Sequence, residues 1–141
     1  MSEDRETRLF MISPDSTVTP DQLAREIHAM GRGVAVKETC YGCLAEGSRA
    51  AVAEVLAEVR GRHPLDVFSK RRAYPAGDPR RCRAQHGTRP GYAQLEAEWA
   101  ALAMISRGLE ACGRGESPRP PAEPAGGLPV EKFKEIAEAI R

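Results

Sequence analysis

The sequence predicts an α+β protein with a ferredoxin-like fold, in which one face of an antiparallel sheet is covered by two helices. The first observation behind this prediction is the order strand, helix, strand, strand, helix, strand within residues 8–69, which is the βαββαβ arrangement of that fold. The second is the composition: 41% of the 141 residues are hydrophobic and 29% are charged, as in an ordinary folded domain.

The first half of this pattern is a buried strand followed by a capped helix. Residues 8–13 form a short apolar run that ends before Pro14, which is typical of a strand. Thr19 is suited to the N-cap of a helix, and Pro20 to its first turn. Apolar residues then recur at spacings of four and three before a glycine that ends the helix: Leu23, Ile27, Met30 and Gly31.

The second half repeats the pattern with a hairpin at its start. Residues 33–38 and 43–46 read as strands, and Gly42 between them is free to adopt positive φ. Ser48 is suited to cap a second helix, and residues 66–69 read as a fourth strand. The apolar stripe of that second helix consists of Val52, Val55, Leu56 and Val59.

The remaining segments extend this unit. We expect one domain over residues 1–112, with a basic loop at 68–91 and a long helix at 92–112. A Pro/Gly-rich linker at 113–127 then leads to a short amphipathic helix at 128–141, which must dock in cis or in trans or stay partly disordered. The stripe of the long helix predicts packing against the sheet or its edge, with the last residue as a small buried hydrophobe: Leu95, Trp99, Leu102, Ile105, Leu109 and Cys112.

The basic loop is the first candidate site. Between residues 70 and 89 its cations are opposed only by Asp78, although the net charge of the whole chain is +1. Arginine predominates, and its guanidinium group binds carboxylates and phosphates through two parallel hydrogen bonds. We therefore expect these residues to contact an acidic protein surface, against the alternative of a solvated loop that aids solubility: Lys70, Arg71, Arg72, Asp78, Arg80, Arg81, Arg83 and Arg89.

Nucleic acid is a weaker candidate partner. A ferredoxin-like sheet that binds RNA stacks bases on aromatic residues of its central strands. Here the first strand offers Phe10, the third offers none, and Tyr41 lies at the turn. The missing aromatic platform and the near-neutral charge argue against nucleic acid.

Four residues form a possible metal or redox site. Cys40 and Cys43 have C-x-x-C spacing, and Cys82 precedes His86 by four residues. Together they could bind zinc or, with less support, an iron–sulfur centre; the alternative is separate reduced thiols. If one thiol is activated, Cys82 is the candidate, because neighbouring arginines would stabilise its thiolate.

No other enzymatic motif stands out, so catalysis is left open and a non-catalytic role is favoured. The chain has no Walker-type loop, no G-x-G-x-x-G loop and no clear Ser/His/Asp spacing. No apolar run approaches the roughly 20 residues needed to span a membrane, and the first residues lack the pattern of a secretion signal. We expect a cytoplasmic protein without a membrane segment.

Several short motifs, taken in order, resemble methanogenesis marker protein 6. They are residues 12–16 (Ile-Ser-Pro-Asp-Ser), 37–42 (Lys-Glu-Thr-Cys-Tyr-Gly), 68–71 (Phe-Ser-Lys-Arg), 77–84 (Gly-Asp-Pro-Arg-Arg-Cys-Arg-Ala), 89–91 (Arg-Pro-Gly) and 94–96 (Gln-Leu-Glu). The resemblance runs from Thr7 to Cys112 and leaves out the linker and the last helix.

This resemblance implies an accessory protein in methane-metabolising archaea. Such marker proteins are associated with the assembly, modification or activation of methyl-coenzyme M reductase. The implied partners are therefore that enzyme or its assembly factors, with an Arg-rich binding module as the leading interpretation. The alternatives are a metal- or thiol-dependent protein using Cys40, Cys43 and Cys82, and a protein that binds an anionic cofactor such as the nickel-containing coenzyme F430.

Overall fold

The described part of the chain contains four strands and four helices. The computed structural model describes residues 4–72, 75–77, 92–122 and 126–140. The elements are β1 (Arg5–Ile12), α1 (Pro20–Ala29), β2 (Ala35–Thr39), β3 (Gly42–Ser48), α2 (Arg49–Arg62), β4 (Val67–Arg72), α3 (Tyr92–Gly113) and α4 (Val130–Ala139).

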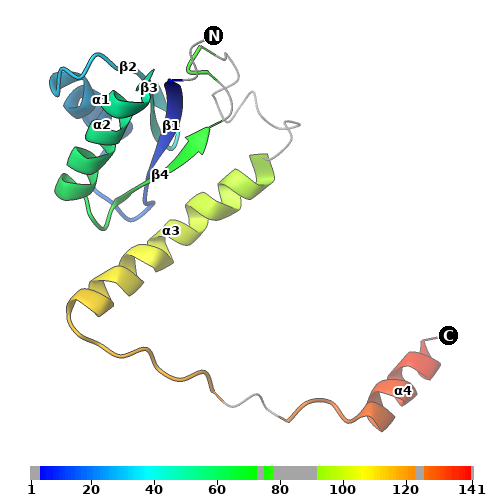
Figure 1. The fold of residues 1–141 in the computed structure, drawn as a ribbon. Coiled ribbons are helices and arrows are strands. Elements are labelled where there is room, and N and C mark those ends of the chain that lie inside the picture. Colours follow the sequence, from blue (N-terminus) through cyan, green and yellow to red (C-terminus); the bar gives the residue numbers. More distant parts are fainter. Residues whose placement is uncertain (1–3, 73–74, 78–91, 123–125, 141) are drawn as a thin grey trace.

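The four strands form one antiparallel sheet in the order β2-β3-β1-β4. This order and the βαββαβ connectivity confirm the predicted ferredoxin-like fold. Helices α1 and α2 cover one face of the sheet, and α3 runs along the other face (Figure 1). Strands β2 and β4 are the two edges.

The two helix N-caps and the hairpin glycine are found where the sequence predicts them. The Thr19 hydroxyl accepts a hydrogen bond from the Gln22 N–H, and the Ser48 hydroxyl accepts one from the Ala51 N–H, both at 3.2 Å. Gly42 has φ +153°, and a Cβ atom there would collide with the carbonyl oxygen of Phe10. The hairpin therefore requires glycine at this position to bring β3 close to β1.

The larger core lies between the sheet and helices α1 and α2. Phe10 of β1 is completely buried and is directly opposite Cys43 of β3. The buried cluster comprises Phe10, Ile12, Leu23, Ile27, Cys43, Ala45, Val55, Val59 and Val67. The cluster contains Leu23 and Ile27 of the stripe predicted for α1 and Val55 and Val59 of the stripe predicted for α2, and the even-numbered positions of β1 point to this face. Met30 and Leu56 of the predicted stripes are partly buried and pack against it.

A smaller core lies between the sheet and the first half of α3. It is built from Leu9, Met11, Leu44 and Leu102, with Phe68, Leu95 and Trp99 packed against it. The indole N–H of Trp99 donates a hydrogen bond to the Ile12 carbonyl at 2.9 Å, and its ring centroid lies 5.3 Å from that of Tyr41. The predicted packing of α3 on the sheet is thus correct for this half of the helix.

The second half of α3 differs from the prediction. Ile105 and Leu109 are exposed, and so is Cys112, which was expected to be a buried hydrophobe. The last buried position of α3 is Ser106. The periodic pattern continues past the point at which α3 leaves the sheet, because periodicity reports a helical face and not what covers that face.

Helix α4 has an apolar side with no buried residue. The exposed side chains on it and just before it are Leu128, Val130, Phe133, Ile136 and Ile140. The helix therefore adds nothing to either core. Among the residues that the structure describes, no helix combines the length and apolar character needed to cross a bilayer.

Candidate functional site

Strand β4 brings three of the predicted partner-binding residues to the edge of the sheet. It extends to Arg72 and pairs with β1 from Val67↔Ile12 to Arg72↔Thr7. The prediction that the loop begins at residue 68 is therefore wrong, since Lys70, Arg71 and Arg72 lie in a strand. Charged residues are common on edge strands, where both faces are close to water.

The alternation of β4 sends these cations to opposite faces. Arg71 lies on the side of α1 and α2, next to Arg8 of β1 in the strand register. Lys70 lies on the side of α3, as its contact with Glu98 shows. The cations at this edge thus flank the strand on both sides.

A carboxylate on the helix side binds two arginines. Glu6 lies 2.9 Å from a guanidinium nitrogen of Arg8 and 3.3 Å from one of Arg71, and 9% of its side chain is exposed. Arg8 also donates a hydrogen bond to the Ser69 hydroxyl at 3.1 Å. Arg71 remains 66% exposed, so its guanidinium can reach a second anion.

On the other face, an ion pair connects β4 to α3. The ammonium group of Lys70 donates a hydrogen bond to Glu98 at 2.7 Å, and Gln94 donates a second one at 2.9 Å. The hydrogen bonds from Lys70 and Gln94 lower the pKa of Glu98, and the bond from Lys70 has the larger effect. Lys70 therefore has a structural contact within the chain in addition to its predicted role.

Glu46 holds the chain just beyond β4. It accepts hydrogen bonds from the backbone N–H of Ala76 at 2.7 Å, from Arg5 at 2.8 Å and from the Thr7 hydroxyl at 2.9 Å. The Ala76 N–H is the main reason that the pKa of Glu46 is lowered. Residues 75–77 are thereby fixed against the sheet, and Ala76 is buried.

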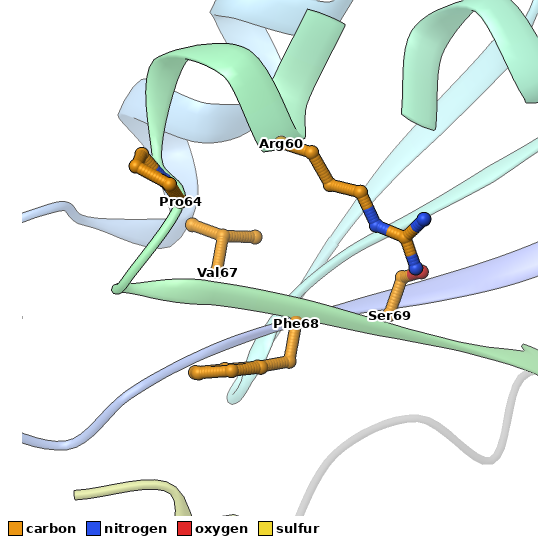
Figure 2. A pocket seen from close by; sticks show the side chains of 5 residues that line it. All are labelled: Arg60, Pro64, Val67, Phe68 and Ser69. Carbon is orange, nitrogen blue, oxygen red and sulfur yellow. The ribbon is translucent and has the colours of Figure 1, made fainter. Parts of the chain in front are cut away.

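A shallow pocket lies beside β4, below the C-terminal end of α2. Its volume is about 340 Å³, and it is lined by Arg60, Pro64, Val67, Phe68 and Ser69. Figure 2 shows Arg60, Val67 and Ser69 on the side of the strand that faces α2, with Phe68 directed to the opposite side. In the described part of the chain, the exposed side chain of Arg60 forms no hydrogen bond or ion pair.

The other predicted members of the basic site are not covered by the described ranges. They are Asp78, Arg80, Arg81, Arg83 and Arg89. Their involvement stays a prediction. What the structure adds is the starting point of this segment, because Glu46 of β3 holds residue 76 over the sheet, four residues after β4 ends.

The two described cysteines of the possible metal site have different environments. Cys40 is exposed at the hairpin turn, whereas Cys43 is completely buried in the larger core. Burial raises the pKa of the Cys43 thiol to about 12, so it stays protonated at neutral pH, and metal binding requires the thiolate. Cys82 and His86 lie outside the described residues. Within the described ranges, no group of three or more His, Cys, Asp or Glu side chains is placed to hold a metal ion.

Sequence reasoning missed the residues that other elements bring to this edge. Arg8 comes from β1 and donates a hydrogen bond to Ser69 of β4, and Arg60 comes from α2 and lies beside the same residue. The charged positions at the start of β1 were a usable signal, because Glu6 and Arg8 lie on one face of a strand. Arg60 gave no such signal, since only the packing of α2 on the sheet places it beside Ser69.

The fold and this edge define a small ferredoxin-like protein whose sheet, over the described residues, ends in the cationic strand β4. Residues 9–110 match the family described as "Uncharacterized protein conserved in archaea (DUF2102)", and the chain belongs to this family. It is also 34% identical, over 148 aligned residues, to "Uncharacterized protein MJ0498" of Methanocaldococcus jannaschii.

The extent of these matches bears on the C-terminal segment. The match to the archaeal relative covers 96% of this chain and 94% of that protein, so it reaches into α4. The linker and α4 are thus part of the region shared with this relative, although the family match ends at residue 110. No solved structure matches the chain significantly.

Proposed function

We propose that this protein is a non-catalytic binding module that attaches to an acidic surface of a partner protein. The observation that carries this proposal is the gathering of cations from β1, β4 and α2 at one edge of the sheet. Arg60 and Arg71 there are exposed, and the arginine-rich segment 78–91 follows β4 in the sequence. Arginine on a fixed scaffold is well suited to bind carboxylates.

Two further observations support protein binding over the alternatives. The sheet face on which a related RNA-binding module would stack bases is covered by α3. The apolar side chains exposed on α4 are typical of a helix that packs against another protein. The metal or thiol alternative receives less support, because Cys43 lies in the core.

The cellular role we propose is that of an accessory protein in methanogenesis. The resemblance to methanogenesis marker protein 6 suggests this role, and the relative in a Methanocaldococcus species is consistent with it. The partner would be methyl-coenzyme M reductase or one of its assembly factors, and the protein would act in the cytoplasm. A carboxylate-rich cofactor such as coenzyme F430 is the alternative ligand of the same arginines.

The test is affinity purification from a methanogen lysate at low and at high salt. We expect wild-type protein to retain a partner at low salt and to release it at high salt, because exposed charges are screened. The double variant Arg80→Glu/Arg81→Glu should lose the partner while keeping its thermal midpoint. The control Arg107→Glu/Arg119→Glu reverses as many charges at exposed positions away from this edge, and it should retain the partner.

Two results would contradict the proposal. If Arg80→Glu/Arg81→Glu retains the same partner at the same salt concentration, the basic segment is not the contact. If wild-type protein retains no protein at either salt concentration but carries a coloured compound, the cofactor alternative is favoured instead.

A further inference from the structure

We propose that the outer edge of β4 binds an extended acidic segment of the partner, which joins the sheet as a fifth strand. This inference rests on the proposed protein-binding function and specifies its mode. Three features of the edge carry it: the direction of the backbone groups, the sign of the flanking charges and the pocket beside Ser69.

Within the residues that the structure describes, the backbone of β4 has N–H and C=O groups at its outer edge that no other strand binds. The Ser13 N–H donates to the Asp66 carbonyl at 2.8 Å, which extends the β1–β4 register by one residue. Residues of an antiparallel pair alternate between those that bond to each other and those that face away. Phe68 and Lys70 therefore bond to β1, whereas the N–H and C=O groups of Ser69 and Arg71 face outward.

The hydrogen bonds on the other side of β1 agree with this assignment. The Ile12 N–H donates to the Tyr41 carbonyl at 2.7 Å, so even-numbered residues of β1 bond to β3 and odd-numbered residues bond to β4. The outward N–H of Val67 already bonds to the His63 carbonyl at 3.3 Å. In the described part of the chain no strand pairs with this edge, which leaves Ser69 and Arg71 as the positions for an added strand.

Charge selects the kind of segment that can pair here. Strand β4 contains three cations and no acidic residue, and Arg60 lies on its helix side. An added strand with acidic side chains would meet cations on both faces, whereas a basic strand would be repelled. A second copy of β4 is also disfavoured, because it would place its own Lys70, Arg71 and Arg72 beside those of the first copy.

The pocket provides a place for one side chain of the added strand. A strand paired with β4 directs alternate side chains toward α2, where the pocket lies (Figure 2). A glutamate is suited to this position. Its methylene groups would pack on Pro64 and Val67, and its carboxylate would meet the guanidinium group of Arg60 and the Ser69 hydroxyl.

A simpler explanation for a cationic edge strand is protection against aggregation. Such protection needs charge alone and does not depend on which peptide approaches. Strand addition depends on backbone N–H groups in the incoming chain as well as on its charge. The two explanations are therefore separated by peptides of equal charge that differ in their ability to pair.

The first experiment compares two labelled peptides of equal length by fluorescence anisotropy at low salt. One alternates glutamate with valine, and the other has the same sequence with every backbone nitrogen methylated, so that it keeps the charge but has no N–H to donate. We expect the methylated peptide to bind about tenfold more weakly, since its hydrogen bonds to the carbonyl groups of Ser69 and Arg71 are lost. Equal affinities would overturn the proposed strand addition.

The second experiment changes the edge itself. Ser69→Pro removes an N–H that does not bond to β1, so the fold should persist, and affinity for the glutamate–valine peptide should fall about tenfold. Ser69→Ala keeps that N–H, removes only the hydroxyl and should bind more tightly than Ser69→Pro. Equal binding by both variants would contradict strand addition.

Hydrogen exchange on the wild-type protein gives a readout that does not depend on any variant. The peptide should slow exchange of the Ser69 and Arg71 amides and leave Phe68 and Lys70 unchanged, because those two already bond to β1. Binding without protection of Ser69 and Arg71 would overturn the inference.

Affinity purification from the methanogen lysate, repeated with Ser69→Pro, distinguishes a failure of this inference from a failure of the proposed function. If Ser69→Pro still retains the lysate partner that Arg80→Glu/Arg81→Glu loses, the binding function stands and strand addition is wrong. If wild-type protein retains no partner at all, the proposed function itself fails.

Discussion

The two faces of the sheet are built differently although they share the same four strands. Among the described residues, the face toward α1 and α2 carries a cluster of nine buried residues, and the face toward α3 carries four. Two helices that follow closely on their strands cover the first face, whereas the helix described on the second face, α3, covers it with its first half. The second face also carries the polar contacts Trp99–Ile12 and Lys70–Glu98.

Because of this difference, the α1/α2 face mainly stabilises the fold, whereas the exposed parts of the molecule are available for interactions. The α1/α2 face is closed, and its buried side chains account for most of the apolar burial that holds the domain together. In the described part of the chain the α3 face is closed where Trp99 and Leu102 pack, and α3 becomes exposed beyond Ser106. The proposed binding edge, β4, lies at the margin of both faces. Substitutions should therefore have effects that depend on the face they alter.

The largest effect is expected from Phe10→Ala, in the centre of the closed face. Removal of a completely buried aromatic ring should lower the free energy of unfolding by about 3–5 kcal/mol, because a cavity remains where the ring was. Chemical denaturation followed by circular dichroism measures this loss. Phe10→Leu, which keeps most of the volume, should cost less than about 1.5 kcal/mol.

A smaller effect is expected from Leu102→Ala on the α3 face. We expect a loss of about 2 kcal/mol, at the low end for a buried leucine, because α3, which carries Leu102, can shift toward the sheet to fill the space. Fluorescence of Trp99, the only tryptophan, reports on this face directly. A loss as large as that of Phe10→Ala would show that the two faces contribute equally to the free energy of unfolding, and it would contradict the proposed difference between them.

The smallest effect is expected from Lys70→Met, which breaks the exposed ion pair with Glu98. The loss should be below about 1 kcal/mol at neutral pH and should shrink in high salt. The pKa of Glu98 is lowered in the folded state. The pair therefore contributes its stability above the ordinary glutamate pKa of about 4.3 and loses it as the pH falls through the depressed value.

The pH profile is thus the control for this last variant. The difference in thermal midpoint between wild type and Lys70→Met should disappear in acid, because protonated Glu98 no longer attracts Lys70. A difference that persists at low pH would mean that the lysine acts through the packing of its methylene chain instead.

The candidate site was only partly accessible to sequence reasoning. The excess of arginine and lysine after residue 69 was visible, and Lys70, Arg71 and Arg72 are indeed at a surface edge. Their place in a strand was not visible, because basic residues are uncommon inside strands and the nearby prolines and glycines suggest a loop. The contribution of Arg60 could not be predicted, since it depends on the contact between α2 and β4.

The sequence by itself determined the elements and their order. The helix caps at Thr19 and Ser48, the glycine at position 42 and the apolar stripes of α1 and α2 are local features, and local backbone preferences are enough to specify them. Only the tertiary structure decided which stripe is covered and which carboxylate meets which cation. Periodicity shows that Leu102 and Leu109 lie on similar faces of α3, but burial depends on where the helix passes the end of the sheet. The exposed half of α3 and the open edge of β4 follow from that geometry, because solvent exposure is a property of the packed molecule and not of the segment.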